Sequence, residues 1–232
     1  MSEDRGYTPI VSMICGPICR VANDLAVAIL PGRCPGCGVR AEPVCDACAV
    51  GLVAAPAAQP PPGVEAWSAA LAYEGVTREL VARLKYRNAR GALRWLAGAA
   101  SDAVIPLCGA GGTRRADLVT WAPTTAARRR ERGFDHAEML ARAIGSRLDL
   151  PVRRILTRLD ATPQTGRAAS ERRSGPRFAA RESSRARCVL IVDDVATTGA
   201  TLSAAARSLH RAGVGSVVAA TVARTPRPHS AR

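Results

Sequence analysis

Residues 188–201 contain the chemical groups that are most informative about function. Five residues of apolar character, 188–192, precede an adjacent pair of carboxylates, Asp193 and Asp194, and small or hydroxylic residues follow the pair. The apolar run predicts a buried strand, and ligands of parallel sheets lie at the carboxyl ends of their strands. Two carboxylates at that position can accept hydrogen bonds from vicinal hydroxyl groups such as those of a sugar.

The residues after the acidic pair suit an anion. They open a predicted helix over 201–211, so backbone N–H groups and the helix dipole favour a phosphate. Threonine hydroxyls add donors, and Gly199 permits close approach of the backbone. The predicted phosphate-binding residues are Ala196, Thr197, Thr198, Gly199, Ala200 and Thr201. The alternative is a capped helix behind two solvated aspartates, and the complete run favours the binding site.

Two C-x-x-C pairs, Cys34 with Cys37 and Cys45 with Cys48, are separated by seven residues. Each pair puts two thiolates on one turn, and two such turns make a tetrahedral four-thiolate site for structural Zn²⁺. Structural buried cysteines or a redox pair are the alternatives, and the arrangement favours zinc. We see no export signal, so disulfides are not expected.

Apolar periodicity predicts the elements that position these motifs. Helical spacing is found at 9–30, 77–86, 134–148 and 201–211, and strand character at 66–73, 118–122, 151–157, 188–192 and 214–223. Strands that alternate with helices predict an α/β fold with a parallel sheet and right-handed crossovers. Residues 160–182 lack any apolar period, which is typical of a mobile functional loop or of disorder.

A Pro- and Ala-rich stretch, 54–63, indicates a linker. We therefore predict an N-terminal segment over 1–62, with a helix and the four cysteines, and a larger domain over 63–232. Neither a signal peptide nor an apolar span long enough for a bilayer is found, which predicts a cytoplasmic protein without membrane contact.

The run 188–201 resembles the phosphoribosyl-pyrophosphate motif of type I phosphoribosyltransferases. The resemblance narrows to the ComF group of competence-protein-like relatives, on the basis of Lys85-Tyr86, Arg132-Gly133-Phe134, Gln164 with Arg172, and the cysteine pairs. Two departures are present. Asp135-His136 stands where the group commonly has Asn-Gln, and Gly175 where Asn often follows the arginine.

The resemblance implies a type I phosphoribosyltransferase-like sheet flanked by helices, with a small zinc-knuckle segment. It implies transfer of phosphoribosyl from phosphoribosyl pyrophosphate to a nitrogen nucleophile, with Mg²⁺ on the substrate. Asp193 and Asp194 would hold the ribose hydroxyls, and 196–201 would wrap the 5′-phosphate. The implied catalytic residues are Asp193, Asp194, Arg132 and Arg172, and Lys85 and Gln164 are implied to bind substrate.

For each cationic residue of the predicted site, a second interpretation stays open. The guanidinium of Arg132 matches phosphate oxygens bidentately, whereas neighbouring residues 128–130 are either phosphate ligands or a solvated run. Lys85 is the only lysine, which suggests a chemical constraint, although a surface lysine on an amphipathic helix has the same pattern. Gln164, Arg172 and Arg173 lie in the stretch without apolar periodicity, which is either a lid over substrate or a disordered basic segment.

The three histidines, His136, His210 and His229, are expected to be structural or to lie at the surface.

The formal charge of +14 at pH 7 supports a second hypothesis. A non-catalytic, nucleotide-sensing or DNA-binding accessory protein of competence would have single-stranded DNA or the DNA-uptake machinery as its partner. Aromatic residues for base stacking are only 3% of the chain, which weakens this reading. A small sugar phosphate or nucleotide is the partner favoured by the acidic pair.

Overall fold

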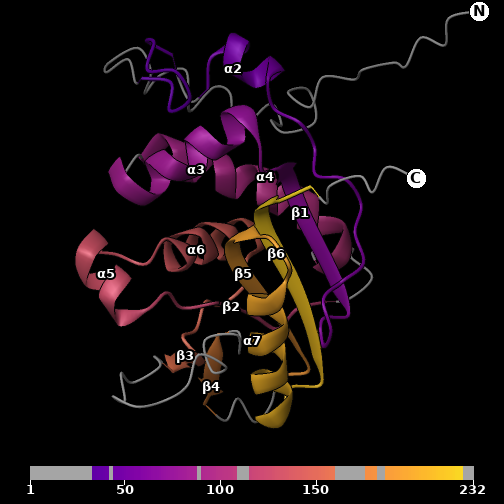
Figure 1. Ribbon diagram of the computed structural model, residues 1–232. Coiled ribbons are helices and arrows are strands. Elements are labelled where there is room, and N and C mark those ends of the chain that lie inside the picture. The colour runs from indigo at the N-terminus through magenta and orange to yellow at the C-terminus, as the bar shows by residue number, and fades with distance from the viewer. Residues whose placement is uncertain are drawn as a thin grey trace, which may run out of the picture.

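The computed structural model describes residues 33–41, 44–87, 90–108, 115–159, 176–181 and 186–226 (Figure 1). Its centre is a four-stranded sheet in the order β1-β6-β5-β2. The strands are β1 (Ala66–Ala72), β2 (Leu118–Trp121), β5 (Cys188–Ala196) and β6 (Ser216–Arg224), and every neighbouring pair is parallel. The predicted parallel α/β sheet is confirmed.

Helices cover both faces of the sheet, and this explains the continuous apolar runs of its strands. Leu190 and Val192 of β5 face a core that includes residues of α3 (Gly75–Arg87), α4 (Arg90–Cys108) and α6 (His136–Leu148). Val189 and Ile191 face the opposite core, which includes residues of α7 (Ala200–Arg211). Figure 1 shows α3, α4 and α6 on one side of the strands and α7 on the other.

The strand predicted over 151–157 is displaced in the structure. Val152 makes one isolated parallel bridge to Val119, and the chain then leaves the sheet. The regular strand β3 (Leu156–Leu159) instead pairs antiparallel with β4 (Arg177–Ala180) as a separate two-stranded unit. The prediction was wrong because the exposed Arg153 and Arg154 interrupt the run, so the buried positions begin at Ile155 and Leu156.

Strand β4 also corrects the prediction that 160–182 lacks structure. The buried ring of Phe178 packs against α7, and the backbone carbonyl of Phe178 accepts a hydrogen bond from Ser208 Oγ. A lone apolar residue among arginines leaves no periodicity in the sequence, which is why this strand was missed. Residues 160–175 and 182–185, and the helix predicted over 9–30, lie outside the described residues.

The Pro- and Ala-rich stretch begins along the free edge of β1. Ala55 N donates to Ala70 O, and Ala72 N donates to Val53 O. Arg224 Nη2, at the end of β6, donates to Pro56 O at 2.8 Å. These contacts attach the cysteine-containing segment, with its short helix α2 (Asp46–Val50), to the sheet. None of the described helices is long and apolar enough to cross a membrane.

Two glycines in helices provide a test of the packing between α6 and the sheet. A Cβ at Gly145 in α6 would clash with Val152 Cγ2 and lie 3.1 Å from Leu150 O, whereas one at Gly98 in α4 would meet only Arg147 Nη1 at 3.9 Å. We expect Gly145→Ala to destabilise the protein by about 1–3 kcal/mol through overpacking. Gly98→Ala should stabilise it by up to about 1 kcal/mol through helix propensity. Urea unfolding of both variants checks this, and equal effects would contradict the packing described.

Candidate functional site

The acidic pair lies where strand β5 extends beyond its neighbour β2. Pairing between β2 and β5 ends at Val192, while β6 continues to pair with β5 as far as Ala196. Asp193 and Asp194 are therefore within the strand, rather than after it as the sequence predicted. Among the described residues no strand continues β2 alongside them, so this side of β5 lacks a pairing strand and can face a ligand.

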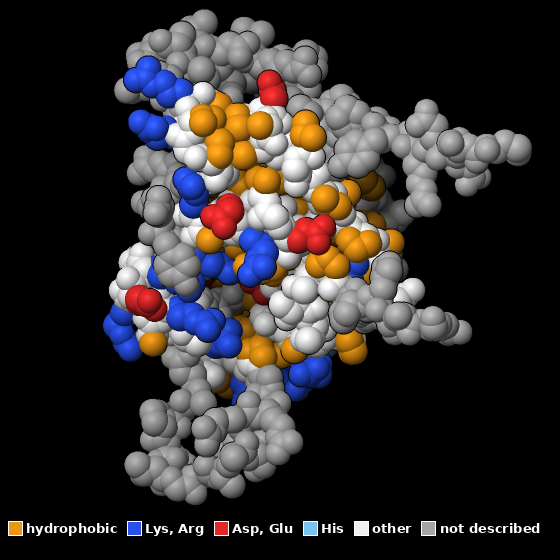
Figure 2. Space-filling view, turned by 45° about the horizontal axis from the view of Figure 1, so that its top comes forward, with side chains coloured by type: hydrophobic (Ala, Val, Ile, Leu, Met, Phe, Trp, Pro, Cys, Tyr) orange, Lys and Arg blue, Asp and Glu red, His pale blue; other side chains and the backbone are white. Residues whose placement is uncertain are grey.

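A cavity of about 370 Å³ is found at this position. Its wall combines four basic side chains with three carboxylates and one imidazole. These are Lys85, Arg128, Arg132, Arg158, Asp135, Asp193, Asp194 and His136. Figure 2 shows lysine and arginine side chains gathered on the side of the molecule where α5 (Ala126–Arg132) lies. Both signs of charge are thus present in one hollow, as a ligand with hydroxyl and anionic groups requires.

Lys85 reaches the acidic pair from helix α3. Its Nζ is 2.9 Å from Asp194 Oδ2, and both side chains are largely buried, with 21% and 14% of their surface exposed. Lys85 is therefore not the freely solvated residue of the alternative interpretation. It neutralises one carboxylate of the pair.

Asp193 sits in the least favourable electrostatic position of the site. Burial, and then the charge of Asp194, raise the pKa of Asp193 well above its ordinary range. The backbone N–H of Asp194, which donates to Asp193 Oδ1 at 2.8 Å, and the Lys85 ammonium act in the opposite direction without reversing the shift. A pKa shifted by burial and a neighbouring charge is typical of a functional site.

The chain between β2 and α6 is held by two side-chain caps. Thr125 Oγ1 accepts from Arg128 N at the start of α5. Asp135 caps α6 through Ala137 N at 3.1 Å and also accepts from Thr124 N at 3.0 Å, so one carboxylate ties both ends of this segment together. Gly133 ends α5 at φ 79°, a conformation that favours glycine. The segment is thereby shaped to present Arg128 and Arg132 to the cavity.

The predicted phosphate loop lies at the edge of the same cavity. Thr201 lines the cavity, whereas Ala196, Thr197, Thr198, Gly199 and Ala200 do not. Gly199 has φ 76°, and a Cβ there would lie 2.6 Å from Pro61 Cγ, so only glycine fits between the loop and the Pro-rich stretch. Thr198 Oγ1 accepts from Ala200 N at 3.3 Å, which begins α7.

The structure brings together the predicted Lys85, Arg132, Asp193, Asp194 and Thr201. Gln164 and Arg172 lie outside the described residues. Sequence reasoning missed the cavity position of Arg158, on β3, for which the sequence carried no signal. It also missed His136, which was expected to be structural or superficial, although the departure Asp135-His136 was a signal at that position. Arg128 reaches the cavity, whereas Arg129 and Arg130 do not line it.

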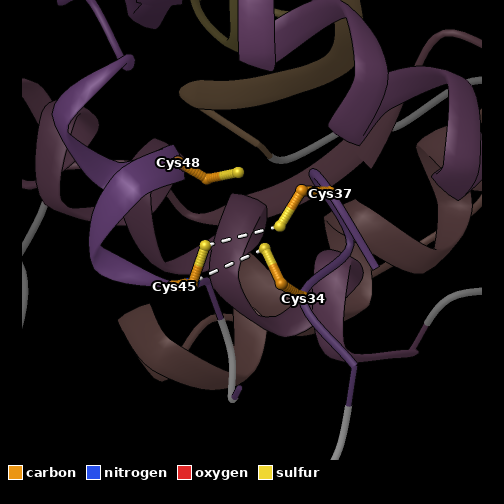
Figure 3. A group of neighbouring side chains, drawn as sticks. All are labelled: Cys34, Cys37, Cys45 and Cys48. Atoms are coloured by element: carbon orange, nitrogen blue, oxygen red, sulfur yellow. Dashed lines mark hydrogen bonds between the residues drawn. The ribbon is translucent and has the colours of Figure 1, made fainter. Parts of the chain in front are cut away.

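The four predicted metal ligands converge in the N-terminal segment. The Sγ atoms of Cys34, Cys37, Cys45 and Cys48 all lie within 4.8 Å of one another and point toward a common centre (Figure 3). A tetrahedral ion with Zn–S bonds of about 2.3 Å requires sulfur separations of about 3.8 Å. A Cβ at Gly36 would lie 2.7 Å from Cys48 Sγ, so the glycine makes room for this thiol. The cluster could therefore hold a zinc ion.

The electrostatics of the four thiols agree with a cation site. Although burial acts to raise the pKa of Cys34, hydrogen bonds from the backbone of Cys45, Cys37 and Gly36 outweigh it and lower that pKa to about 6. Burial, and then the neighbouring thiols, raise the pKa of Cys48 far above its ordinary value. The raised pKa of Cys48 shows that four adjacent thiolates would be unfavourable together unless a positive ion lay at their centre.

Comparison with known proteins agrees with this geometry. Residues 132–231 match the family model described as phosphoribosyl transferase domain. The match covers less than half of the chain; it contains the acidic pair and the run after it, but neither Lys85 nor the four cysteines. The predicted fold class is confirmed: a phosphoribosyltransferase-like parallel sheet flanked by helices, with an N-terminal four-cysteine cluster.

Four solved chains match the structure. One is described as the structure of the allosteric regulatory enzyme of purine biosynthesis, with a TM-score of 0.33 and 20% identity. That match covers 48% of this chain and 23% of the other, so this chain corresponds to under a quarter of that protein's length. Comparison with curated proteins gives no match.

The raised pKa of Asp193 predicts that Asp193→Asn stabilises the folded protein by an amount that depends on pH. In wild type the carboxyl is protonated in both folded and unfolded states at low pH, and the folded state loses relative stability as pH rises through the raised folded pKa. Asn stays neutral and its Oδ1 can still accept from Asp194 N. We expect a melting temperature above that of wild type at pH 7–8, by about 2–4 °C per kcal/mol gained, and a smaller difference toward pH 4. Thermal unfolding across this range checks it, with Asp149→Asn as an exposed control; a gain that grows toward acid pH would refute the assignment.

Proposed function

We propose that this protein binds phosphoribosyl pyrophosphate or a nucleoside 5′-monophosphate at the end of β5. We further propose that it transfers the phosphoribosyl group to a nitrogen nucleophile and releases pyrophosphate. The observation that carries the proposal is one cavity lined by Asp193 and Asp194 together with Lys85, Arg128 and Arg132. The family match over 132–231 supports the substrate class.

Each part of the ligand has a complementary part of the site. The carboxylates of Asp193 and Asp194 would accept hydrogen bonds from the ribose 2′ and 3′ hydroxyls. The backbone of 197–201, at the N-terminus of α7, would bind the 5′-phosphate. Arg132 and Arg128, on the opposite wall, would bind the pyrophosphate through their planar donors. Gln164 and Arg172 remain proposed parts of a lid.

The reaction would break the bond between C1 of the ribose and the pyrophosphate oxygen and form a bond from C1 to the incoming nitrogen. Positive charge develops at C1 and negative charge on the leaving pyrophosphate. The protein would hold the reacting groups in line, and its arginines would stabilise the leaving group. The carboxylates near C1 would favour the developing positive charge.

Mg²⁺ fits the chemistry of the site, because carboxylate oxygens of Asp193 and Asp194 lie beside the region proposed for the sugar and pyrophosphate. The ion would be held mainly by substrate oxygens and would neutralise pyrophosphate charge. Lys85 would neutralise Asp194 when no substrate is present.

We also propose membership of the ComF group, which is supported by the four-cysteine cluster and by the convergence of Lys85 and Arg132 on the acidic pair. A role in competence would follow from it. The second candidate, a nucleotide-sensing or DNA-binding accessory protein without catalysis, is supported by the ion pair that already engages Asp194 and by the net charge of +14. Pyrophosphate release with any base or amine would exclude this second candidate.

Asp194→Asn tests the ribose site. Loss of a hydrogen bond to a charged group should weaken binding of phosphoribosyl pyrophosphate by about 1–3 kcal/mol, measured by isothermal titration with Mg²⁺ present. Asp149→Asn, at the exposed end of α6, should bind like wild type. Unchanged affinity in a correctly folded Asp194→Asn protein would remove the acidic pair from the proposed site.

The cysteine cluster should contain structural zinc. We expect about one zinc per chain by elemental analysis, and destabilisation of the N-terminal segment on chelation. Gly36→Ala should lower the zinc content, because its Cβ displaces Cys48 Sγ. Cys108→Ala is the matched control, since this buried cysteine lies outside the cluster and its loss should leave zinc unchanged. Zinc-free protein from a metal-replete preparation, or a disulfide among the four cysteines, would overturn the proposal.

A further inference from the structure

His136 occupies an unexpected position at the start of α6. Its side chain is only 5% exposed and lines the cavity. Its Nε2 lies 2.8 Å from Arg132 Nη1 and 3.7 Å from Asp194 Oδ2. The ring of Phe134 packs edge-on against it, with centroids 5.9 Å apart. The imidazole thus lies close to both the last residue of α5 and the acidic pair of β5.

These contacts determine the protonation of the ring. A guanidinium has only donors, so His136 Nε2 must be the acceptor in the 2.8 Å contact and the proton of the neutral ring must be on Nδ1. The longer distance to Asp194 fits this assignment, because two acceptors do not approach one another. Burial, and the charges of Arg132 and Lys85, lower the pKa of His136, against the opposing effect of Asp194 and Asp135. The ring is therefore neutral near pH 7.

A neutral acceptor has a different effect on a cation than a carboxylate has. The contact with His136 fixes one N–H of the Arg132 guanidinium without cancelling its charge. Lys85 in the same cavity has a carboxylate partner, since its ammonium lies 2.9 Å from Asp194 Oδ2. Through one nitrogen, Nε2, the imidazole of His136 lies close to both Arg132 and Asp194.

We propose that His136 is a positioning residue that holds Arg132 in place as the binding group for the pyrophosphate portion of the ligand. This inference rests on the function proposed above and adds a specific determinant to it. The Nδ1 atom of His136 is buried and has no hydrogen-bond partner among the described residues. An unpaired buried donor costs about 1–3 kcal/mol, so the imidazole is not explained by stability alone.

Calorimetric titration with two separate probes tests the proposal: inorganic pyrophosphate and ribose 5-phosphate, each with Mg²⁺. His136→Phe keeps an aromatic ring but removes the acceptor, and should weaken pyrophosphate binding about tenfold while changing ribose 5-phosphate binding less than about twofold. His136→Gln places an amide oxygen near the former Nε2 and should restore most of the lost pyrophosphate affinity. On an Arg132→Ala background, His136→Phe should cause no further loss, because the two residues act as a unit.

The outcomes separate this inference from the proposed function. Additive losses in the double variant, or equal losses for both probes, would show that His136 acts only through the general structure of the cavity. Failure of the wild-type protein to bind either probe would overturn the proposed function and this inference with it. The ring can also be examined without ligand: ¹⁵N NMR, assigned with His136→Gln, should show the Nδ1–H tautomer at pH 7, and an Nε2–H tautomer would refute the contact with Arg132.

Discussion

The structure of the site depends on placing two adjacent carboxylates at a partly buried strand end. Burial opposes the charge of Asp193, and so does the neighbouring charge of Asp194. Lys85 compensates part of this unfavourable energy from a helix more than one hundred residues earlier in the chain. That compensation requires α3 to pack on this face of the sheet, which Leu80, Val81 and Leu84 achieve by their complete burial. The core of the domain and the electrostatics of the cavity are therefore coupled.

Hydrogen bonds organise the segment that joins β2 to α6 beside the cavity. Asp135 joins Thr124 to the start of α6, and His136 joins that helix to Arg132 at the end of α5. A short turn thus gives one N–H of the Arg132 guanidinium a fixed acceptor.

The cysteine cluster is joined to the sheet through the segment that follows it. Leu52 is buried in the core beside α3 and β1, and the backbone of Val53 and Ala55 pairs with β1. Further along, Pro61 packs against Gly199 of the predicted phosphate loop. The Pro-rich stretch therefore contacts both the edge of the sheet and the loop after β5. The four cysteines do not line the cavity.

The sequence by itself determined the elements whose signals are local. The apolar run of β5, the amphipathic spacing of α6 and α7, and the two cysteine pairs each depend on residues a few positions apart, and all were predicted. Tertiary structure alone decided that Lys85 pairs with Asp194, that Arg158 reaches the cavity, and that β4 forms around Phe178. It also decided the position of His136 beside Arg132 and Asp194, which no local pattern in the sequence indicates. These contacts join distant parts of the chain, and their energies depend on burial and on charges that local sequence patterns do not encode.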